Sequence, residues 1–366
     1  LCSMMLTRGT EKRTAAQIAE QIDRIGAHLE TDSGRNTINI SAGGKAEDFE
    51  TILEILSDCL LNANFPLDEM ERIKQRMVAK IRDKDSSWDA ELMNKFRESF
   101  YAPHPYSHYA YGTEESIGKI TRKQLREYLD RYRTPGNMVV AVFGAVPPKK
   151  AEISVTRFFK NLSGDDFQGL PNRPDANFPE SEQTVESRTR KNTAGFVLGF
   201  PGMTVTNTSD YFAMEVLDAI VSGIGYPTGW LHNRLRGKDK GLVYVVHAFN
   251  RTGIDPGAFI IYGATAKNRL PEVKKIVFDV VEKTQTQTVS PEELQKAKNI
   301  CTLSNNLFRQ SNNSQAVNAA LKELLGLGYD FDKKYKQKIN QVSAEDIQRV
   351  ARKYFENHLW LTTVPE

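Results

Sequence analysis

Two stretches of this 366-residue sequence repeat each other without a gap, and this repeat limits the possible folds more than any other feature. The residues from Ile120 to Tyr132 align with those from Val342 to Tyr354. Apolar residues in both stretches have helical spacing, and each stretch precedes a short apolar segment that is typical of a strand. These segments are residues 137–144 and 358–364. The same helix and strand are therefore expected twice.

A second repeat lies at nearly the same sequence offset. The residues from Pro66 to Lys74 correspond to those from Ser290 to Lys298, with the same helix start and the same charge pattern. Chance similarity between two surface helices would not keep the offset of the first repeat. The sequence therefore predicts an internal duplication, in which one folding unit occurs twice.

The duplication divides the chain into three parts. We expect a first domain in residues 1–162 and a second in residues 183–366, because a chain of this length is long for one core. Residues 163–182 are rich in Gly, Pro and polar residues and are expected to be a linker. The sequence opens with Leu1-Cys-Ser-Met-Met-Leu6, which is typical of the middle of an apolar helix. We therefore expect a fragment whose first domain lacks its opening strand.

Strand and helix patterns occur in both halves without a regular order. Alternating or apolar runs predict strands at residues 36–41, 194–199 and 258–264. Helical periodicity is present at residues 46–62, 67–84, 210–220 and 270–281. Because strict strand–helix–strand alternation is absent, we predict an α+β fold. Its two domains would be similar, each an antiparallel-rich sheet with helices on one face, and related by pseudo-twofold symmetry.

The composition excludes several classes of partner. The 49 basic and 46 acidic residues are interspersed and give a net charge of only +3, so nucleic acid is not expected. No apolar run approaches the roughly 18 residues that span a bilayer, so no membrane association is expected either. We expect a soluble protein, cytoplasmic or periplasmic if it is bacterial. The three cysteines, Cys2, Cys59 and Cys301, are too far apart for a thiolate zinc site or a disulfide framework.

The most informative single stretch for function runs from Gly229 to Tyr244. Its apolar spacing predicts a helix that ends at Arg236, then a turn bounded by Gly237 and Gly241, then a strand that carries Tyr244. A guanidinium and a phenol can both donate to a carbonyl oxygen, or to the oxyanion that forms when the carbonyl is attacked. A structural alternative stays open, because arginine often ends a helix and tyrosine is common in strands.

The histidines give no clear metal site. His104 and His108 have a spacing that suits a metal ligand pair on a helix, but Pro103 and Pro105 indicate a loop. The other four histidines are isolated and are expected to be structural or on the surface. Spacing alone therefore reveals no complete active site.

The order of several motifs resembles the pitrilysin or insulinase-type zinc peptidases, which include mitochondrial processing peptidases and core proteins of respiratory complex III. The resemblance covers nearly the whole chain, and its most specific part is the stretch from Gly229 to Tyr244. The other matching segments are Met5–Thr10, Ile25–Leu29, His104–Tyr106, Tyr111–Thr113 and Ser290–Leu294.

In that family an inverted motif, H-x-x-E-H, supplies two zinc ligands and a glutamate base. The resemblance places the motif's glutamate at Ser3 and its second histidine at Met4. The third ligand would fall near Ala79 or Lys80, and a lysine would repel the cation. The resemblance therefore implies no metal and no catalytic residue in this chain, with zinc in a partner half.

The resemblance implies a function as the non-catalytic half of a zinc metallopeptidase. In the family, an Arg/Tyr pair contacts substrate across a closed chamber, and Arg236 and Tyr244 stand where that pair is expected. They would bind peptide and stabilise the oxyanion for a zinc-bearing homologous half, in the same parent chain or in a separate subunit, with a homodimer as another arrangement. The alternative is a structural or assembly subunit like the respiratory core proteins, without proteolysis.

Overall fold

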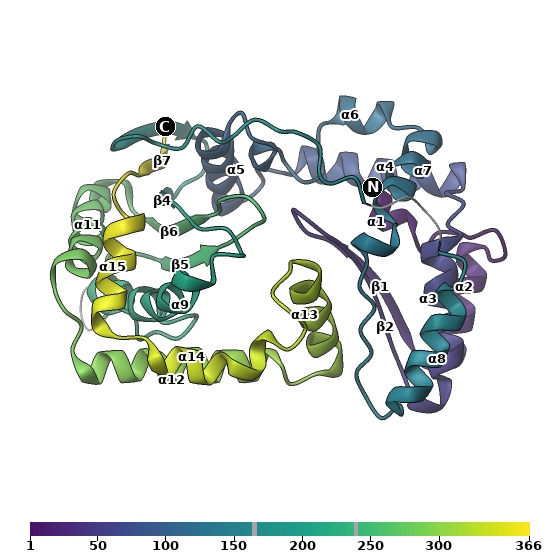
Figure 1. The fold of residues 1–366 in the computed structure, drawn as a ribbon. Coiled ribbons are helices and arrows are strands. Elements are labelled where there is room, and N and C mark those ends of the chain that lie inside the picture. Colours follow the sequence, from purple (N-terminus) through teal and green to yellow (C-terminus); the bar gives the residue numbers. More distant parts are fainter. Residues whose placement is uncertain (163–166, 238–240) are drawn as a thin grey trace. The chain divides into compact units, whose positions relative to one another are not determined.

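The computed structural model describes residues 1–162, 167–237 and 241–366. The chain forms two compact units that do not follow the order of the sequence (Figure 1). Unit 1 consists of Leu1–Asp83, Tyr109–Asn172 and Arg309–Tyr329, and unit 2 consists of Lys84–His108, Arg173–Phe308 and Asp330–Glu366. Helix α5 (Trp88–Tyr101) thus joins unit 2, and helix α13 (Asn312–Leu324) joins unit 1. The division into sequence-related halves, 1–162 and 183–366, stays a prediction.

Unit 2 contains a five-stranded sheet in the order β3-β7-β4-β6-β5. All neighbouring strands are antiparallel except β3 and β7, so the expected antiparallel-rich sheet is confirmed for this unit. Besides α5, its elements are η2 (Pro105–Ser107), β3 (Gln183–Thr189), β4 (Ala194–Pro201), α9 (Thr208–Ser222), α10 (Trp230–Leu235), β5 (Val245–Arg251), β6 (Ala258–Thr265), η4 (Lys267–Arg269), α11 (Leu270–Thr286), α12 (Pro291–Phe308), η5 (Phe331–Lys334), α14 (Tyr335–Gln341), α15 (Ala344–Tyr354) and β7 (Leu359–Pro365).

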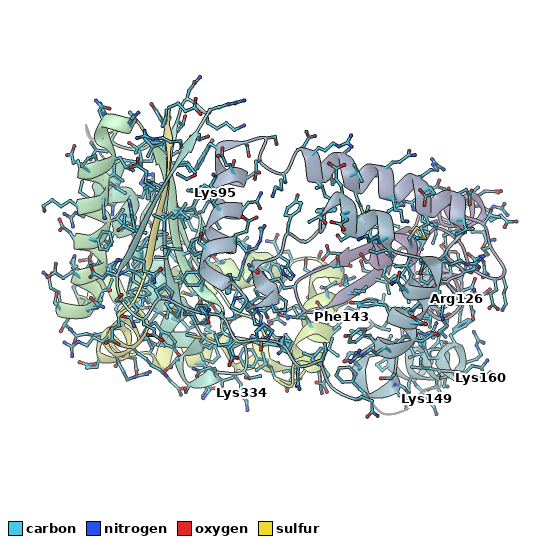
Figure 2. The ribbon with its side chains drawn as sticks, turned by 90° about the horizontal axis from the view of Figure 1, so that it is seen from above. Lys95, Arg126, Phe143, Lys149, Lys160 and Lys334 are labelled. Carbon is cyan, nitrogen blue, oxygen red and sulfur yellow. The ribbon has the colours of Figure 1, made fainter. Side chains whose placement is uncertain are left out.

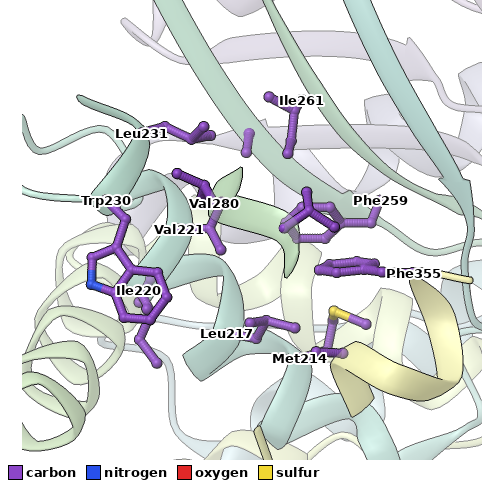
Figure 3. Close-up of a cluster of buried hydrophobic side chains, with 14 of the residues drawn as sticks. Met214, Leu217, Ile220, Val221, Trp230, Leu231, Phe259, Ile261, Val280 and Phe355 are labelled. Atoms are coloured by element: carbon purple, nitrogen blue, oxygen red, sulfur yellow. The ribbon is translucent and has the colours of Figure 1, made fainter. Parts of the chain in front are cut away.

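Strand β4 is buried along nearly its whole length because helices cover both faces of the sheet. Its side chains alternate between two cores, as the period of two requires. Phe196, Leu198 and Phe200 face a large core with α9, α11 and α15, part of which Figure 3 shows. Val197 faces the opposite side and packs against Phe96 of α5. The expectation of helices on one face of the sheet is therefore wrong for this unit. The second face is covered by α5, a helix from the first half of the sequence.

Unit 1 contains a two-stranded antiparallel sheet, β1 (His28–Ser33) paired with β2 (Ile38–Gly43). Both α3 and α13 contact β2, from opposite sides of the hairpin (Figure 1). The remaining elements are α1 (Cys2–Met5), α2 (Ala15–Arg24), η1 (Ala46–Asp48), α3 (Phe49–Leu61), α4 (Leu67–Arg82), α6 (Glu114–Lys119), α7 (Arg122–Tyr132), η3 (Pro135–Asn137) and α8 (Pro148–Phe159). Charged side chains such as Lys149 and Lys160, at the ends of α8, extend into solvent (Figure 2).

The two aligned stretches form helices of the same length with the same start. Both α7 and α15 have 11 residues, and each begins with a capping box. In each box, the hydroxyl of Thr121 or Ser343 accepts a hydrogen bond from the backbone N–H of the residue three positions later. The side chain of that later residue, Gln124 or Asp346, accepts a hydrogen bond from the backbone N–H of Thr121 or Ser343. The sequence repeat is thus matched by a structural one at these helices.

The repeated helices α4 and α12 are also anchored in the same way. Lys74 of α4 donates its Nζ proton to the backbone oxygen of Gly118 at 3.2 Å. Lys298 of α12 donates to the backbone oxygen of Asn340 at 2.9 Å. Gly118 and Asn340 each lie two residues before one of the aligned stretches. A buried lysine stem with its ammonium on a carbonyl thus recurs at corresponding places.

The expected strand at residues 137–144 does not form. Pro135–Asn137 is a 3-10 turn, and residues 138–143 belong to no helix or sheet in the described part of the chain. The corresponding β7 pairs with β3 on one side and β4 on the other. A strand is stable only where neighbours take its backbone hydrogen bonds, and such neighbours are lacking for residues 138–143 in the described part of the chain.

Candidate functional site

The stretch from Gly229 to Tyr244 forms the helix and the return of the chain that its sequence predicts. Helix α10 has only six residues, and Leu231 and Leu235 are buried in the large core of unit 2. Arg236 is the C-cap, and its backbone N–H donates to the His232 oxygen at 2.8 Å. Such a short helix is not stable alone, so its apolar face and its contacts hold it in place.

Backbone hydrogen bonds tie the end of α10 to the start of β5. The Leu242 N–H donates to the Leu235 oxygen at 2.9 Å, and the Tyr244 N–H donates to the Ala264 oxygen of β6 at 2.8 Å. The Thr265 hydroxyl donates to the Leu242 oxygen at 2.6 Å. Residues 238–240 of the turn lie outside the described residues. Arg236 and Tyr244 thus flank one Leu235–Leu242 backbone link.

Both predicted site residues present their side chains to solvent. Tyr244 is 64% exposed, and Arg236 is also exposed. Tyr244 lies one residue before β5 rather than within it, because the strand begins at Val245. Two hydrogen-bond donors are therefore available to a ligand on this part of unit 2.

His232, which is expected from the sequence to be isolated, interacts with Arg236 in the structure. Burial lowers the pKa of the His232 imidazole, and the Arg236 guanidinium lowers it further. The imidazole is therefore neutral at pH 7, which leaves Arg236 as the cation of this pair. The i, i+4 spacing on α10 was the signal that could have predicted this proximity.

The positions of the family's zinc ligands do not fit a metal ion. Met4, in place of the second histidine, is half-buried in α1 beside the buried Ser3, which replaces the glutamate base. Ala79 and Lys80, at the position of the third ligand, are exposed on α4. The Lys80 ammonium lies 5.8 Å from the centroid of the Tyr111 ring. Burial raises the pKa of the nearby Cys2 thiol to about 11, so it is not a thiolate ligand at neutral pH. Within the described residues, no group of three or more His, Cys, Asp or Glu could hold a metal.

His104 takes part in a structural cluster rather than in metal binding. Its Nδ1 accepts from the Tyr106 backbone N–H at 3.0 Å, so its Nε2 carries the proton and donates to Asp255 at 3.2 Å. Arg173 also binds Asp255 through two hydrogen bonds, at 2.6 and 2.5 Å. The cluster fastens the middle of the predicted linker to the turn between β5 and β6.

The sequence matches two family profiles in succession. Residues 1–114 match the profile described as Insulinase (Peptidase family M16), and residues 119–301 match Peptidase M16 inactive domain. A relative in Rickettsia felis, named as an uncharacterized zinc protease, is 28% identical over 96% of this chain and 83% of its own length. A probable mitochondrial-processing peptidase subunit beta of Arabidopsis thaliana is 24% identical over 96% of this chain and 67% of its own length.

Solved structures show the same fold over the whole chain. A peptidase M16 inactive domain from Pseudomonas fluorescens has a TM-score of 0.90 at 20% identity, and covers 100% of this chain and 87% of its own. A protease from Helicobacter pylori has a TM-score of 0.88 at 19% identity, with 99% and 88% covered. Among the described residues, every helix is too short or too polar to cross a bilayer.

Proposed function

Because the chain belongs to peptidase family M16, we propose that it is the non-catalytic half of a zinc metallopeptidase and that Arg236 and Tyr244 bind its peptide substrate. One observation carries this proposal. Two exposed donor side chains flank a single backbone link between α10 and β5, in a chain whose Met4 and Lys80, at two expected ligand positions, do not suit a zinc ion.

The chemistry assigned to the pair is stabilisation of negative charge. During attack on a peptide bond, the carbonyl oxygen becomes an oxyanion, and donors aimed at it lower the barrier. The guanidinium is charged and the phenol is protonated at neutral pH, so both can donate without a change of protonation. His232 beside Arg236 is neutral and adds no second positive charge at pH 7.

The proposal requires a homologous partner half that carries the zinc, in the same parent chain or as a separate subunit. The name of the Arabidopsis relative, a subunit of a processing peptidase, supports an assembly of this kind. We further propose that residues 1–162 and 183–366 are two copies of one α+β domain with pseudo-twofold symmetry. The matched capping boxes of α7 and α15 support the duplication.

The test is to assemble the chain with a zinc-bearing homologous half and to measure peptide turnover. We expect Arg236→Ala and Tyr244→Phe each to lower kcat by on the order of a hundredfold, roughly 3 kcal/mol. Tyr329→Phe is the matched control, because Tyr329 is 65% exposed but lies in unit 1. Full turnover in both variants of an intact complex would reject the proposal in favour of a structural subunit.

A further inference from the structure

A buried indole and a carboxylate anchor the first turn of α10, the helix that ends at Arg236. Trp230 is only 9% exposed, and its indole N–H donates to the Glu293 Oε1 of α12 at 2.8 Å. The Lys283 ammonium of α11 lies 3.6 Å from the centroid of the Trp230 ring. Figure 3 shows the indole at the margin of the core, with its nitrogen turned away from Met214 and Phe355.

The Glu293 carboxylate is itself held in one orientation. Its second oxygen, Oε2, accepts from the Ser290 hydroxyl at 3.0 Å, and the Glu293 N–H donates to Ser290 Oγ at 3.2 Å. Burial alone would raise the pKa of Glu293, but hydrogen bonds from Trp230 and Ser290 and the charge of Lys283 outweigh it and lower the pKa. The anchor is therefore an ionised acceptor at neutral pH.

The corresponding glutamate of the first copy has a different contact. Glu69 is the equivalent of Glu293 in the sequence repeat, and it pairs with Arg72 on its own helix at 2.8 Å. Such an i, i+3 pair on the surface contributes little to stability. Among the described residues, this glutamate thus holds another helix in the copy that carries Arg236 and not in the first copy.

The polar contact between α10 and α11 is weaker. Arg234 donates to Asp279 of α11 at 3.0 Å, but the two side chains are 39% and 32% exposed, so water screens the pair. Asp279 is shared with Lys275 at 3.2 Å. The Trp230–Glu293 contact has a buried indole as its donor and a half-buried carboxylate as its acceptor, so water screens it less.

We propose that Glu293 is a positioning residue, which acts through Trp230 to orient α10 so that Arg236 points at the substrate carbonyl. This inference rests on the proposed function of Arg236. Loss of the anchor would leave the chain folded, because Leu231 and Leu235 stay in the core, but the end of α10 would sample more orientations. A donor displaced by about 1 Å can cost up to roughly a hundredfold in rate.

The test compares Glu293→Gln, Trp230→Phe, Arg236→Ala and the double variant Glu293→Gln/Arg236→Ala in the complex with the zinc-bearing half. Glu293→Gln removes the charge, whereas Trp230→Phe keeps a ring but removes the N–H donor. Both are expected to lower kcat by about tenfold or more with little change in KM. Glu292→Gln is the control, since Glu292 is an exposed neighbour on the same helix turn.

Non-additivity separates positioning from general stability. If Glu293 acts through Arg236, the double variant should be no slower than Arg236→Ala alone. If Glu293→Gln lowered kcat by the same factor in the Arg236→Ala variant as in the wild type, the inference would be overturned. So would full turnover of both anchor variants while Arg236→Ala is impaired. Full turnover of Arg236→Ala would instead reject the proposed function itself, and these failures are therefore distinguishable.

Discussion

The ring of Phe96 lies so close to Gly199 that a methyl group at position 199 would overlap it. Phe96 is on α5, and Gly199 is on the central strand β4. A methyl group at Gly195, four residues earlier on the same face of β4, would lie 3.3 Å from Leu92 and 3.4 Å from Trp88 of α5, which is a tight contact without overlap. These glycines let a helix from the first half of the sequence pack directly on a sheet of the second half.

We predict that Gly199→Ala destabilises the protein by about 1–3 kcal/mol, because Phe96 must move within a filled core. Urea unfolding of the variant and the wild type measures the difference. Gly118→Ala is the control, since a methyl group there meets nothing within 4 Å and alanine favours the helix. A Gly199→Ala variant as stable as wild type would show that α5 does not pack this closely.

A buried carboxylate should make folding sensitive to acid. Asp210 accepts from Arg349 at 2.6 Å, Lys353 at 2.7 Å and Tyr354 at 2.8 Å, which ties α9 to α15. Burial alone would raise the pKa of Asp210, but these hydrogen bonds outweigh it and hold the pKa far below its usual range.

We therefore expect Asp210→Asn to lower the free energy of unfolding by about 1–3 kcal/mol near pH 7. This loss is smaller than that for a fully buried ion pair, because Arg349 and Lys353 are half-exposed and water screens their charges. A lowered pKa stabilises the fold above the unfolded pKa of about 3.9, and this contribution falls as the pH drops below it. The gap between wild type and variant should thus narrow below about pH 4. A gap that does not change between pH 7 and pH 3 would contradict the assignment, and exposed Asp130→Asn is the control.

The two capping boxes should contribute equally to stability. We predict that Thr121→Ala and Ser343→Ala each cost about 1 kcal/mol, because each leaves helix N–H groups without an acceptor. The costs should add in the double variant, since the caps share no partner. Chemical denaturation measures both, and Thr121→Ser should retain wild-type stability. A cost at only one of the two helices would argue against equivalent roles.

The purified chain should hold no stoichiometric zinc and should not cleave peptides. Ser3 and Met4 replace the glutamate and histidine of the family motif, and Lys80 is a cation. Metal analysis of the protein by mass spectrometry, with and without a chelator, checks the prediction. One tightly bound zinc per chain, lost together with peptidase activity on chelation, would refute it.

The local elements of this protein could be predicted because their signals are local. Apolar spacing and the repeat between residues 120–132 and 342–354 predict α7 and α15, and the capping boxes that begin these helices are also local. The apolar run at residues 194–199 predicts β4. The helix before Arg236 and the return to a strand near Tyr244 follow from apolar spacing and glycines, and the order of motifs predicts the family.

The tertiary structure decided which residues far apart in the sequence contact each other. Helix α5 packs in unit 2 and α13 in unit 1, so each packs in the unit formed mainly by the other half of the sequence. The sequence of a helix shows its apolar face but not which surface covers that face, so this exchange could not be predicted. Residues 138–143 have a strand-like pattern, yet pairing depends on neighbours and not on the segment itself. Likewise, Trp230 and Glu293 are 63 residues apart, and only the packing of α10 against α12 makes one the anchor of the other.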